Sequence, residues 1–150
     1  MIYIEKPEGF KPVVEVIGCF LEYQDKILLL HRQEHKPEGN RWGIPGGKIE
    51  KNETPLEAGI REVLEETGFD LSNVETNYLG KVFIVGPTCH YVYHMMQSVP
   101  NEEPANIKIQ FDSHKGFTWV TPADALKMDL MSDEDPCIKL IYDTITVSPK

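Results

Sequence analysis

Three glutamates, Glu62, Glu65 and Glu66, are the residues of this sequence whose types and spacing point most directly to chemistry. With about 100° of rotation per residue, a helix would place all three on one face. Carboxylates three or four residues apart repel each other by about a few tenths of a kcal/mol per pair, so stability alone would favour lysines between them. Hard divalent cations such as Mg²⁺ bind carboxylate oxygens together with water and substrate phosphates. The cluster therefore indicates a metal site.

The segment that must position these acids carries the start and stop signals of a helix. Thr54 can cap the first turn, Pro55 presets the backbone angle at the first helical position, and Glu57 can return the capping-box bond. Gly68 can close the helix in the left-handed conformation. We therefore predict one helix between Thr54 and Gly68.

The predicted helix has an apolar face and an acidic face. Arg61 lies beside Glu65 and Glu57, where its fork could orient a carboxylate. Ala58 and Gly59 border the acidic face, so nothing bulky on the helix would exclude a ligand. The residues expected to pack on a sheet are Leu56, Ile60, Val63, Leu64 and Thr67.

An acidic face can also be an ordinary solvated surface, and the wider spacing distinguishes the two interpretations. The fixed positions, in chain order, are Gly47, Glu53, Arg61, Glu62, Val63, Glu65, Glu66, Gly68 and Phe69. This pattern resembles the Nudix box, and the sequence departs from it at no fixed position over the twenty-three residues from Gly47 to Phe69. A solvated surface would not require such a pattern.

The resemblance implies an enzyme that hydrolyses a nucleoside diphosphate linked to another group. In such a family, Mg²⁺ or Mn²⁺ bridges the phosphates and a water molecule attacks phosphorus. The implied metal ligands are Glu62, Glu65, Glu66 and the backbone of Gly46.

The resemblance also gives roles to the residues around these ligands. Glu53 and Arg61 match residues that support the metal ligands, so we count both with the catalytic set. Glu62 is the candidate general base within the box. The segment from Asp112 to Trp119 resembles an acid-histidine segment of some Nudix members, although Ser113 stands where an acid often precedes the histidine. His114 is therefore either a catalytic base, a phosphate contact or a surface histidine.

Two residues ahead of the box are candidates for substrate binding. Arg32 ends a predicted strand and is either a phosphate ligand or a solvated strand end. Trp42 precedes the glycine turn and is either a core residue or a platform on which a base stacks. Between them, residues 33–41 form a polar loop that could hold substrate.

Composition narrows the class of protein. With 150 residues, 41% of them hydrophobic, and no apolar run long enough for a bilayer, the chain fits one domain over 1–150. A net charge of −9 disfavours long nucleic acids, whereas metal ions can bridge a small polyphosphate to an acidic site. No secretory signal is visible at the start, so we expect a cytoplasmic protein without membrane contacts. Three widely spaced cysteines argue against disulfides and zinc.

The order of the predicted elements gives the fold class. Strands are predicted over 13–23, 27–30, 79–85, 89–99 and 117–120, with the box helix in the middle. Thr121 and then Ser132 to Asp135 open two further helices, the last of which carries Ile138, Leu140, Ile141 and Ile145. We therefore expect an α/β fold in which a central mixed sheet lies between helices, as in the α/β/α sandwich that the Nudix resemblance implies.

These observations lead to one main interpretation and two alternatives. The main interpretation is a Mg²⁺- or Mn²⁺-dependent hydrolase that converts a nucleoside triphosphate to the monophosphate and pyrophosphate. Nucleotide sugars, ADP-ribose and dinucleoside polyphosphates are alternative substrates, and a homodimer is left open. An alternative of a different class is a nucleotide-sensing Nudix module without turnover, but such modules commonly lose box glutamates and this sequence has all of them.

Overall fold

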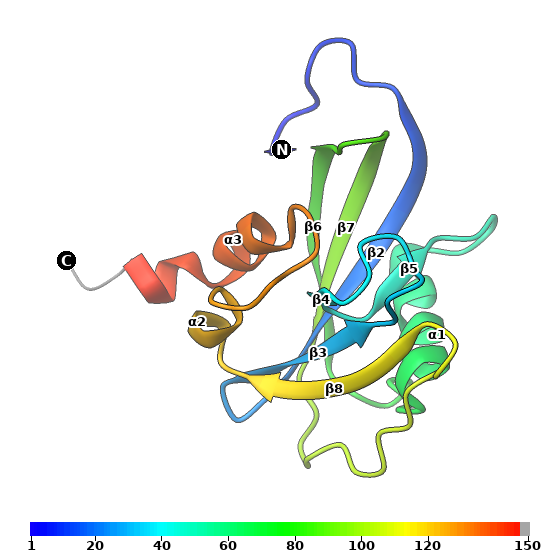
Figure 1. Ribbon diagram of the computed structural model, residues 1–150, viewed down its shortest axis with the longest axis vertical. Helices are drawn as coiled ribbons and strands as arrows, with labels where there is room; N and C mark the ends of the chain where they lie inside the picture. The colour runs from blue at the N-terminus through cyan, green and yellow to red at the C-terminus, as the bar shows by residue number, and fades with distance from the viewer. Residues whose placement is uncertain (148–150) are drawn as a thin grey trace.

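The structure is a computed structural model that describes residues 1–147, with side chains for residues 1–142. An eight-stranded sheet in the order β1-β6-β7-β2-β3-β4, with β5 on β2 and β8 on β3, forms its centre (Figure 1). The strands are β1 (Ile2–Tyr3), β2 (Pro12–Tyr23), β3 (Lys26–Arg32), β4 (Trp42–Gly43), β5 (Gly46–Lys48), β6 (Thr76–Val85), β7 (His90–Ser98) and β8 (His114–Val120). The helices are α1 (Pro55–Thr67), α2 (Pro122–Ala125) and α3 (Glu134–Val147).

The sheet is mixed because β2 and β7 run parallel, whereas the other neighbouring strands are antiparallel. β2 pairs with β7 along nearly its whole length, but with β3 only at Glu22–Ile27 and Tyr23–Lys26. The opposite edge of β2 is instead taken by β5, where Gly18 faces Gly46. Beyond the β2–β3 turn the sheet therefore divides, and β3, β4 and β8 diverge from β2.

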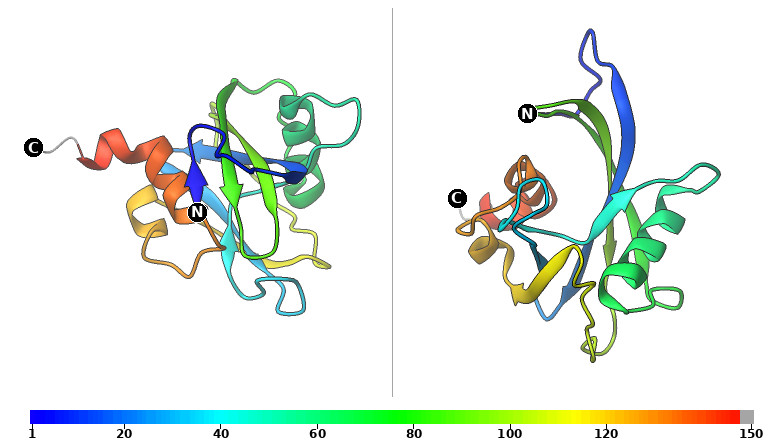
Figure 2. Two further views of the ribbon diagram at one scale, coloured as in Figure 1. Left: turned by 90° about the horizontal axis from the view of Figure 1, so that it is seen from above. Right: turned by 45° about the vertical axis from the view of Figure 1, so that its right-hand side comes forward.

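Helices cover both faces of the sheet. Figures 1 and 2 show α1 on one side and α2 with α3 on the other. The core under α1 includes Ile17, Val63 and Met96, all fully buried. This arrangement confirms the predicted α/β fold with a central mixed sheet between helices. The order and direction of the strands could not be predicted from hydrophobic periodicity and are known only from the structure.

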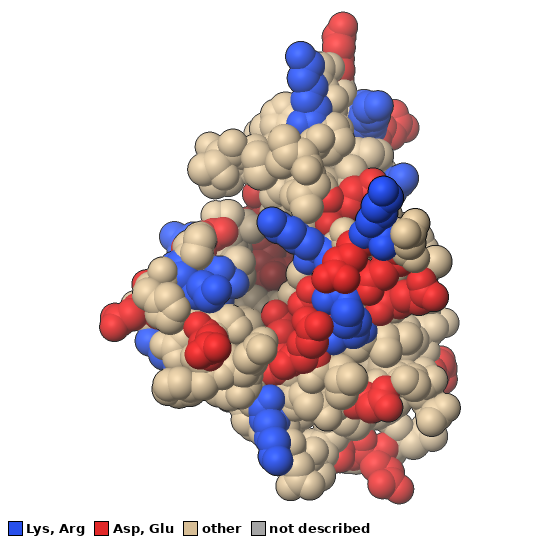
Figure 3. All heavy atoms as spheres, turned by 90° about the vertical axis from the view of Figure 1, so that its right-hand side faces the viewer, with Lys and Arg blue, Asp and Glu red and all other residues tan. Residues whose placement is uncertain are grey.

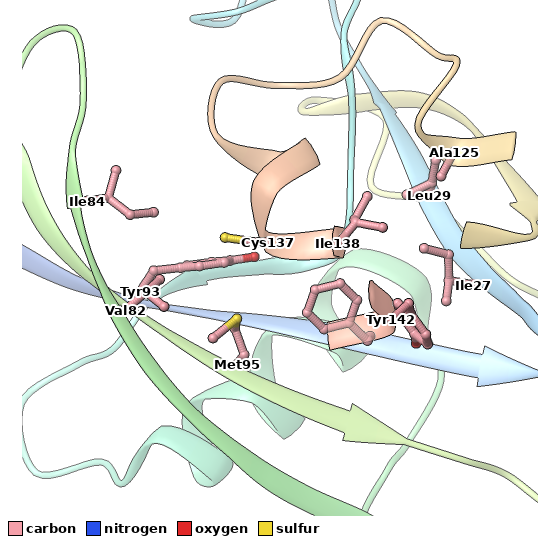
Figure 4. Close-up of a cluster of buried hydrophobic side chains, with 11 residues drawn as sticks. Ile27, Leu29, Val82, Ile84, Tyr93, Met95, Ala125, Cys137, Ile138 and Tyr142 are labelled. Atoms are coloured by element: carbon pink, nitrogen blue, oxygen red, sulfur yellow. The ribbon is translucent and has the colours of Figure 1, made fainter. Parts of the chain in front are cut away.

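The second core joins α2 and α3 to the other face (Figure 4). Ile138 and Tyr142 of α3 pack there beside Tyr93 and Met95 of β7. The predicted last helix is present, and of the apolar residues named on it Leu140 is 41% exposed. Ile145 lies outside the residues whose side chains are described.

The start and end of α1 confirm the helix signals. Thr54 Oγ1 accepts the Glu57 N–H at 3.2 Å, and Glu57 Oε1 accepts the Thr54 N–H at 2.9 Å, which completes the capping box. Gly68 has a φ of 76° and donates its N–H to the Leu64 carbonyl. These local interactions set where the helix begins and ends.

The buried face of α1 differs from the prediction. Ala58 and Gly59 are buried against the sheet and do not border a ligand, whereas Leu64 is 47% exposed. A Cβ atom on Gly59 would lie 2.0 Å from the Met96 sulfur, so this helix approaches the sheet too closely for a larger side chain. Hydrophobicity patterns miss such a contact because they give small residues little weight.

The predicted start of β8 was also too late. The strand begins at His114, which faces Arg32 of β3, and His114 is buried. The interpretation of His114 as a surface loop residue was therefore wrong. Among the described residues, no helix is long and apolar enough to cross a membrane.

Replacing Thr54 tests the helix cap. Thr54→Ala removes the acceptor of one capping-box bond from an exposed position and should lower the free energy of unfolding by about 1 kcal/mol. Thr54→Ser retains the hydroxyl and is the matched control. Denaturant unfolding of both variants measures the effect, and an equal loss in the serine variant would show that the hydrogen bond is not what stabilises this end.

Candidate active site

The last turn of α1 is bonded to the glycine turn. Gly46 N–H donates to Glu66 Oε1 at 2.9 Å. Gly46 itself is packed against β2, because a Cβ atom there would lie 2.2 Å from the Ile17 carbonyl oxygen. Any other residue would push β5 away from β2 and move the donor that holds Glu66.

The neighbouring glycine makes room for a second carboxylate. A Cβ atom on Gly47 would lie 2.4 Å from the carboxyl carbon of Glu62. The Glu62 side chain, 15% exposed, therefore lies directly against the β5 backbone. The two glycines let α1 and β5 approach until Glu62 and Glu66 both border the turn.

Arg61 connects the acids around the site. Its Nε and Nη2 donate to the two oxygens of Glu53 at 2.7 and 2.9 Å, and Nη1 donates to Glu62 at 3.0 Å and to Glu65 at 3.3 Å. Nη2 also donates to the Lys48 carbonyl at 3.0 Å. The predicted neighbour Glu57 is not part of this network, because its carboxylate is engaged in the helix cap.

Arg61 and burial shift the pKa values of the surrounding carboxylates in different directions. Its hydrogen bonds lower the pKa of Glu53 to about 2 and keep that group charged. Burial raises the pKa of Glu62, and the Arg61 hydrogen bond and charge act against it. Burial also raises the pKa of Glu66 to about 8, opposed by the Gly46 N–H and supported by the charge of Glu62. Glu62 and Glu66 are thus partly desolvated neighbours that a cation would stabilise.

The donor set fits a hard divalent cation. Glu62, Glu65 and Glu66 offer only oxygen ligands, and burial raises the pKa of Glu62 and of Glu66, so the protein compensates the charges of these two only in part. In the described part of the chain, no three histidine, cysteine or acidic side chains are arranged so that they could hold a metal ion by themselves. Mg²⁺ usually keeps water molecules and completes its shell with substrate phosphates, so it can bind through one or two of these carboxylates.

A cavity of about 210 Å³ extends from Glu66 into the molecule, whereas Glu62 and Glu65 are not among the residues that line it. Figure 3 shows acidic side chains gathered around a hollow on the side that carries α1, with lysine and arginine side chains at its edge. Glu66 and Gly46 line the cavity together with Arg32 and His114. Four of the predicted site residues therefore share one cleft.

Arg32 and Trp42 differ in their relation to this cleft. Arg32 lines it and donates from Nε to the Pro37 carbonyl at 2.8 Å. Trp42 is not among the lining residues; it stacks on His31 with ring centroids 4.1 Å apart and packs partly against the core. The structure therefore brings Arg32, but not Trp42, to the cleft, and a role for Trp42 in substrate binding stays a prediction.

The inner end of the cleft contains a residue that the sequence interpretation missed. Glu134 is 9% exposed, and within the described residues its carboxylate has only long contacts, 3.4 Å from the Ile44 N–H and 3.4 Å from the Tyr93 hydroxyl. Burial raises its pKa to about 7. The sequence showed Glu134 only as an acid at the start of a helix, and its position near Ile44 depends on how α3 packs on the sheet.

The clustered carboxylates beside a glycine turn, in a cleft between a mixed sheet and its helices, define a hydrolase site of the kind that the box implies. The model of the NUDIX domain family matches residues 11–141. The chain therefore belongs to the Nudix family, and it is an enzyme, a pyrophosphohydrolase. Nudix hydrolases generally use divalent metal ions.

Individual relatives agree with this family. The CTP pyrophosphohydrolase of Escherichia coli is 27% identical over 128 residues, which cover 85% of this chain and 90% of that protein. A putative 8-oxo-dGTP diphosphatase 3 of Mycobacterium tuberculosis is 32% identical over 93 residues, 55% of this chain and 42% of that protein. The solution structure of the E. coli ORF135 protein has the same fold, with a TM-score of 0.73, 23% identity and coverage of 96% and 99% of the two chains.

A divalent cation should stabilise the folded protein. Binding to Glu62 and Glu66 would offset the repulsion and desolvation of the two carboxylates, and ligands that bind only the native state raise its stability. We expect thermal melting to shift upward in millimolar Mg²⁺ or Mn²⁺, measured against the same ionic strength of NaCl. An unchanged melting temperature would contradict a metal site on this face.

Glu66→Gln tests the metal ligand most directly. Glutamine keeps the shape and can still accept the Gly46 N–H, but it removes the charge, so the turnover number should fall by about two orders of magnitude or more while folding survives. The matched control is Glu57→Gln on the same helix, where glutamine can maintain the capping box. Turnover and thermal melting of both variants are measured, and equally small effects would mean that the metal is held elsewhere.

Proposed function

We propose that this enzyme hydrolyses a nucleoside triphosphate to the nucleoside monophosphate and pyrophosphate, with Mg²⁺ or Mn²⁺ as cofactor. One observation carries the proposal. A single cleft contains the carboxylate of Glu66, the guanidinium of Arg32, and the buried acid Glu134 at its inner end. A polyphosphate and a nucleobase require such different environments within one binding site.

The inner end of the cleft suits a nucleobase. Glu134 retains unused hydrogen-bonding capacity because both of its contacts are long, and an acid with a pKa near 7 can donate as well as accept. Tyr91 and Tyr93 line the same region and provide aromatic surface. We propose that Glu134 recognises the base by forming hydrogen bonds to its polar edge.

The outer end suits phosphates. Arg32 is a donor, and a divalent ion held by Glu62, Glu65, Glu66 and the Gly46 backbone would neutralise the phosphate charge and polarise the phosphorus centre. Glu53 holds the Arg61 guanidinium, which in turn fixes the position of Glu62 through a hydrogen bond. Without this guanidinium Glu62 would lose its only recorded hydrogen-bond donor within the described residues.

The reaction transfers the nucleotidyl group to water by attack at the α-phosphorus. The water oxygen bonds to phosphorus, the phosphoanhydride bond breaks, and pyrophosphate leaves with the released electron pair. The water proton must pass to a base, and we assign this role to Glu62, whose raised pKa makes it a better acceptor than an exposed glutamate.

The relatives support a triphosphate substrate. The E. coli protein that matches most of this chain is named for CTP and the mycobacterial relative for 8-oxo-dGTP, both nucleoside triphosphates. Sequence identities of 27% and 32% do not indicate which base this chain prefers, because base choice depends on a few residues at the inner end of the cleft. We therefore propose the nucleoside triphosphate class, without a particular base, and small nucleotides as partners rather than long nucleic acids.

A nucleotide panel tests the proposal. The common ribo- and deoxyribonucleoside triphosphates, ADP-ribose, a nucleotide sugar and a dinucleoside tetraphosphate are incubated with enzyme and Mg²⁺, and products are separated by ion-exchange chromatography. We expect the highest kcat/KM for a triphosphate, with monophosphate and pyrophosphate in equal amounts. Glu66→Gln, assayed in parallel, shows that the activity belongs to this site. Faster hydrolysis of ADP-ribose or the nucleotide sugar, or stepwise release of orthophosphate, would contradict the proposal.

A further inference from the structure

His114 is a buried histidine at the outer end of the cleft. It opens β8, is 6% exposed, and stands opposite Arg32 where the pairing of β3 and β8 becomes irregular. Its backbone N–H donates to the Gln110 carbonyl at 3.0 Å, and its own carbonyl lies 3.5 Å from the Gln33 amide nitrogen. The backbone is thus held on both sides, and the imidazole lines the same cavity as Glu66.

The two ring nitrogens are in different environments. Within the described residues, His114 Nδ1 is the one buried side-chain nitrogen or oxygen that has no hydrogen-bond partner. Nε2 has no recorded partner in this part of the chain either, but it is not among the fully buried atoms, so it keeps contact with the cleft. A buried polar atom without a partner calls for a physical explanation.

The position of the ring proton follows from this asymmetry. A proton on Nδ1 would create a buried N–H without an acceptor, and unpaired buried N–H groups are rarer than unpaired acceptors. An imidazolium would create the same unpaired N–H and add a charge. The remaining form is the neutral ring with its proton on Nε2. Burial and the charges of Arg32 and Lys36 also favour the neutral ring, because they lower the pKa of His114 to about 4.

We propose that His114 binds the substrate by donating Nε2–H to a non-bridging oxygen of the polyphosphate beside Arg32, and that it does not act as the general base. The proposal rests on the proposed function, since it assigns the outer end of the cleft to phosphate. Within that function it decides between the two roles that the sequence left open for His114.

The chemistry of the two nitrogens excludes the base role. Nε2 has no lone pair in the ring plane to accept a proton from water once it carries its own hydrogen. Nδ1 has such a lone pair, but it is buried away from solvent and from any described polar partner. A neutral donor beside Arg32 adds a hydrogen bond to the anion without an additional charge close to the carboxylates of the site.

The tautomer and the phosphate contact can be measured without turnover. Two-dimensional ¹H–¹⁵N NMR of imidazole nitrogens in the wild-type protein distinguishes a protonated Nε2 from a protonated Nδ1, and inorganic pyrophosphate with Mg²⁺ is the probe ligand. We expect a protonated Nε2 in the free protein and a shift of its resonance on titration with pyrophosphate. A protonated Nδ1, or an unchanged Nε2 resonance at saturating pyrophosphate, would overturn the proposal.

Two substitutions separate a donor from a base. Glutamine can place an amide N–H near the position of Nε2, so His114→Gln should bind pyrophosphate within about threefold of wild type, whereas His114→Ala should bind about 10- to 100-fold more weakly. The same pattern is expected in KM, with kcat changed much less. His90→Gln, at a histidine of β7 that is not among the residues lining the cleft, is the matched control and should leave both quantities unchanged.

A general base gives the opposite pattern. Both His114→Gln and His114→Ala would then lose about 10²- to 10⁴-fold in kcat with nearly unchanged pyrophosphate affinity. Thermal melting of each variant shows whether it is folded, and the wild-type NMR measurement remains decisive if a variant does not fold. If no nucleotide is hydrolysed but pyrophosphate still shifts Nε2, the proposed function fails and the role of His114 stands.

Discussion

The hydrogen bond from the Gly46 N–H to Glu66 is the interaction on which the site depends, because it joins α1 to the sheet at the point where the carboxylates gather. Gly46 can donate there only because β5 lies against β2 without an intervening side chain. Gly47 provides the corresponding space for Glu62. The glycines of the box thus act through packing: they determine how closely the helix that carries the acids approaches the strand that faces them.

This close approach has an electrostatic cost. It brings Glu62 and Glu66 out of water and near each other, and the protein compensates only part of their charge, through Arg61 and one backbone donor. A fold selected for stability alone would bury apolar or oppositely charged groups at this position. The metal-binding role that we propose for Glu62 and Glu66 requires this uncompensated charge, so stability and that role make opposite demands on the same two side chains.

The parts of the fold that the sequence predicted well are those set by local interactions. Thr54, Glu57 and Gly68 define α1 through bonds to near neighbours, and the spacing of the box therefore gave the acidic face correctly. The failures involve contacts between distant segments. Gly59 rather than Leu64 meets the sheet, His114 is buried by pairing with β3, and Glu134 enters the cleft from α3. None of these contacts leaves a periodic signal in the chain.

The pairing of β2 with β7 has a consequence for how the enzyme is made. Val16 pairs with Tyr93, so the central strand of the sheet acquires this neighbour only after most of the chain has been synthesised. α1 rests partly on Met96 of β7, and its cap can form much earlier because the capping bonds are local. The nascent chain can therefore contain a formed helix with all its acids before it has a cleft. Closing such a long loop is slow, and activity should appear only after β7 has docked and β8 and α3 have added His114 and Glu134 to the cleft.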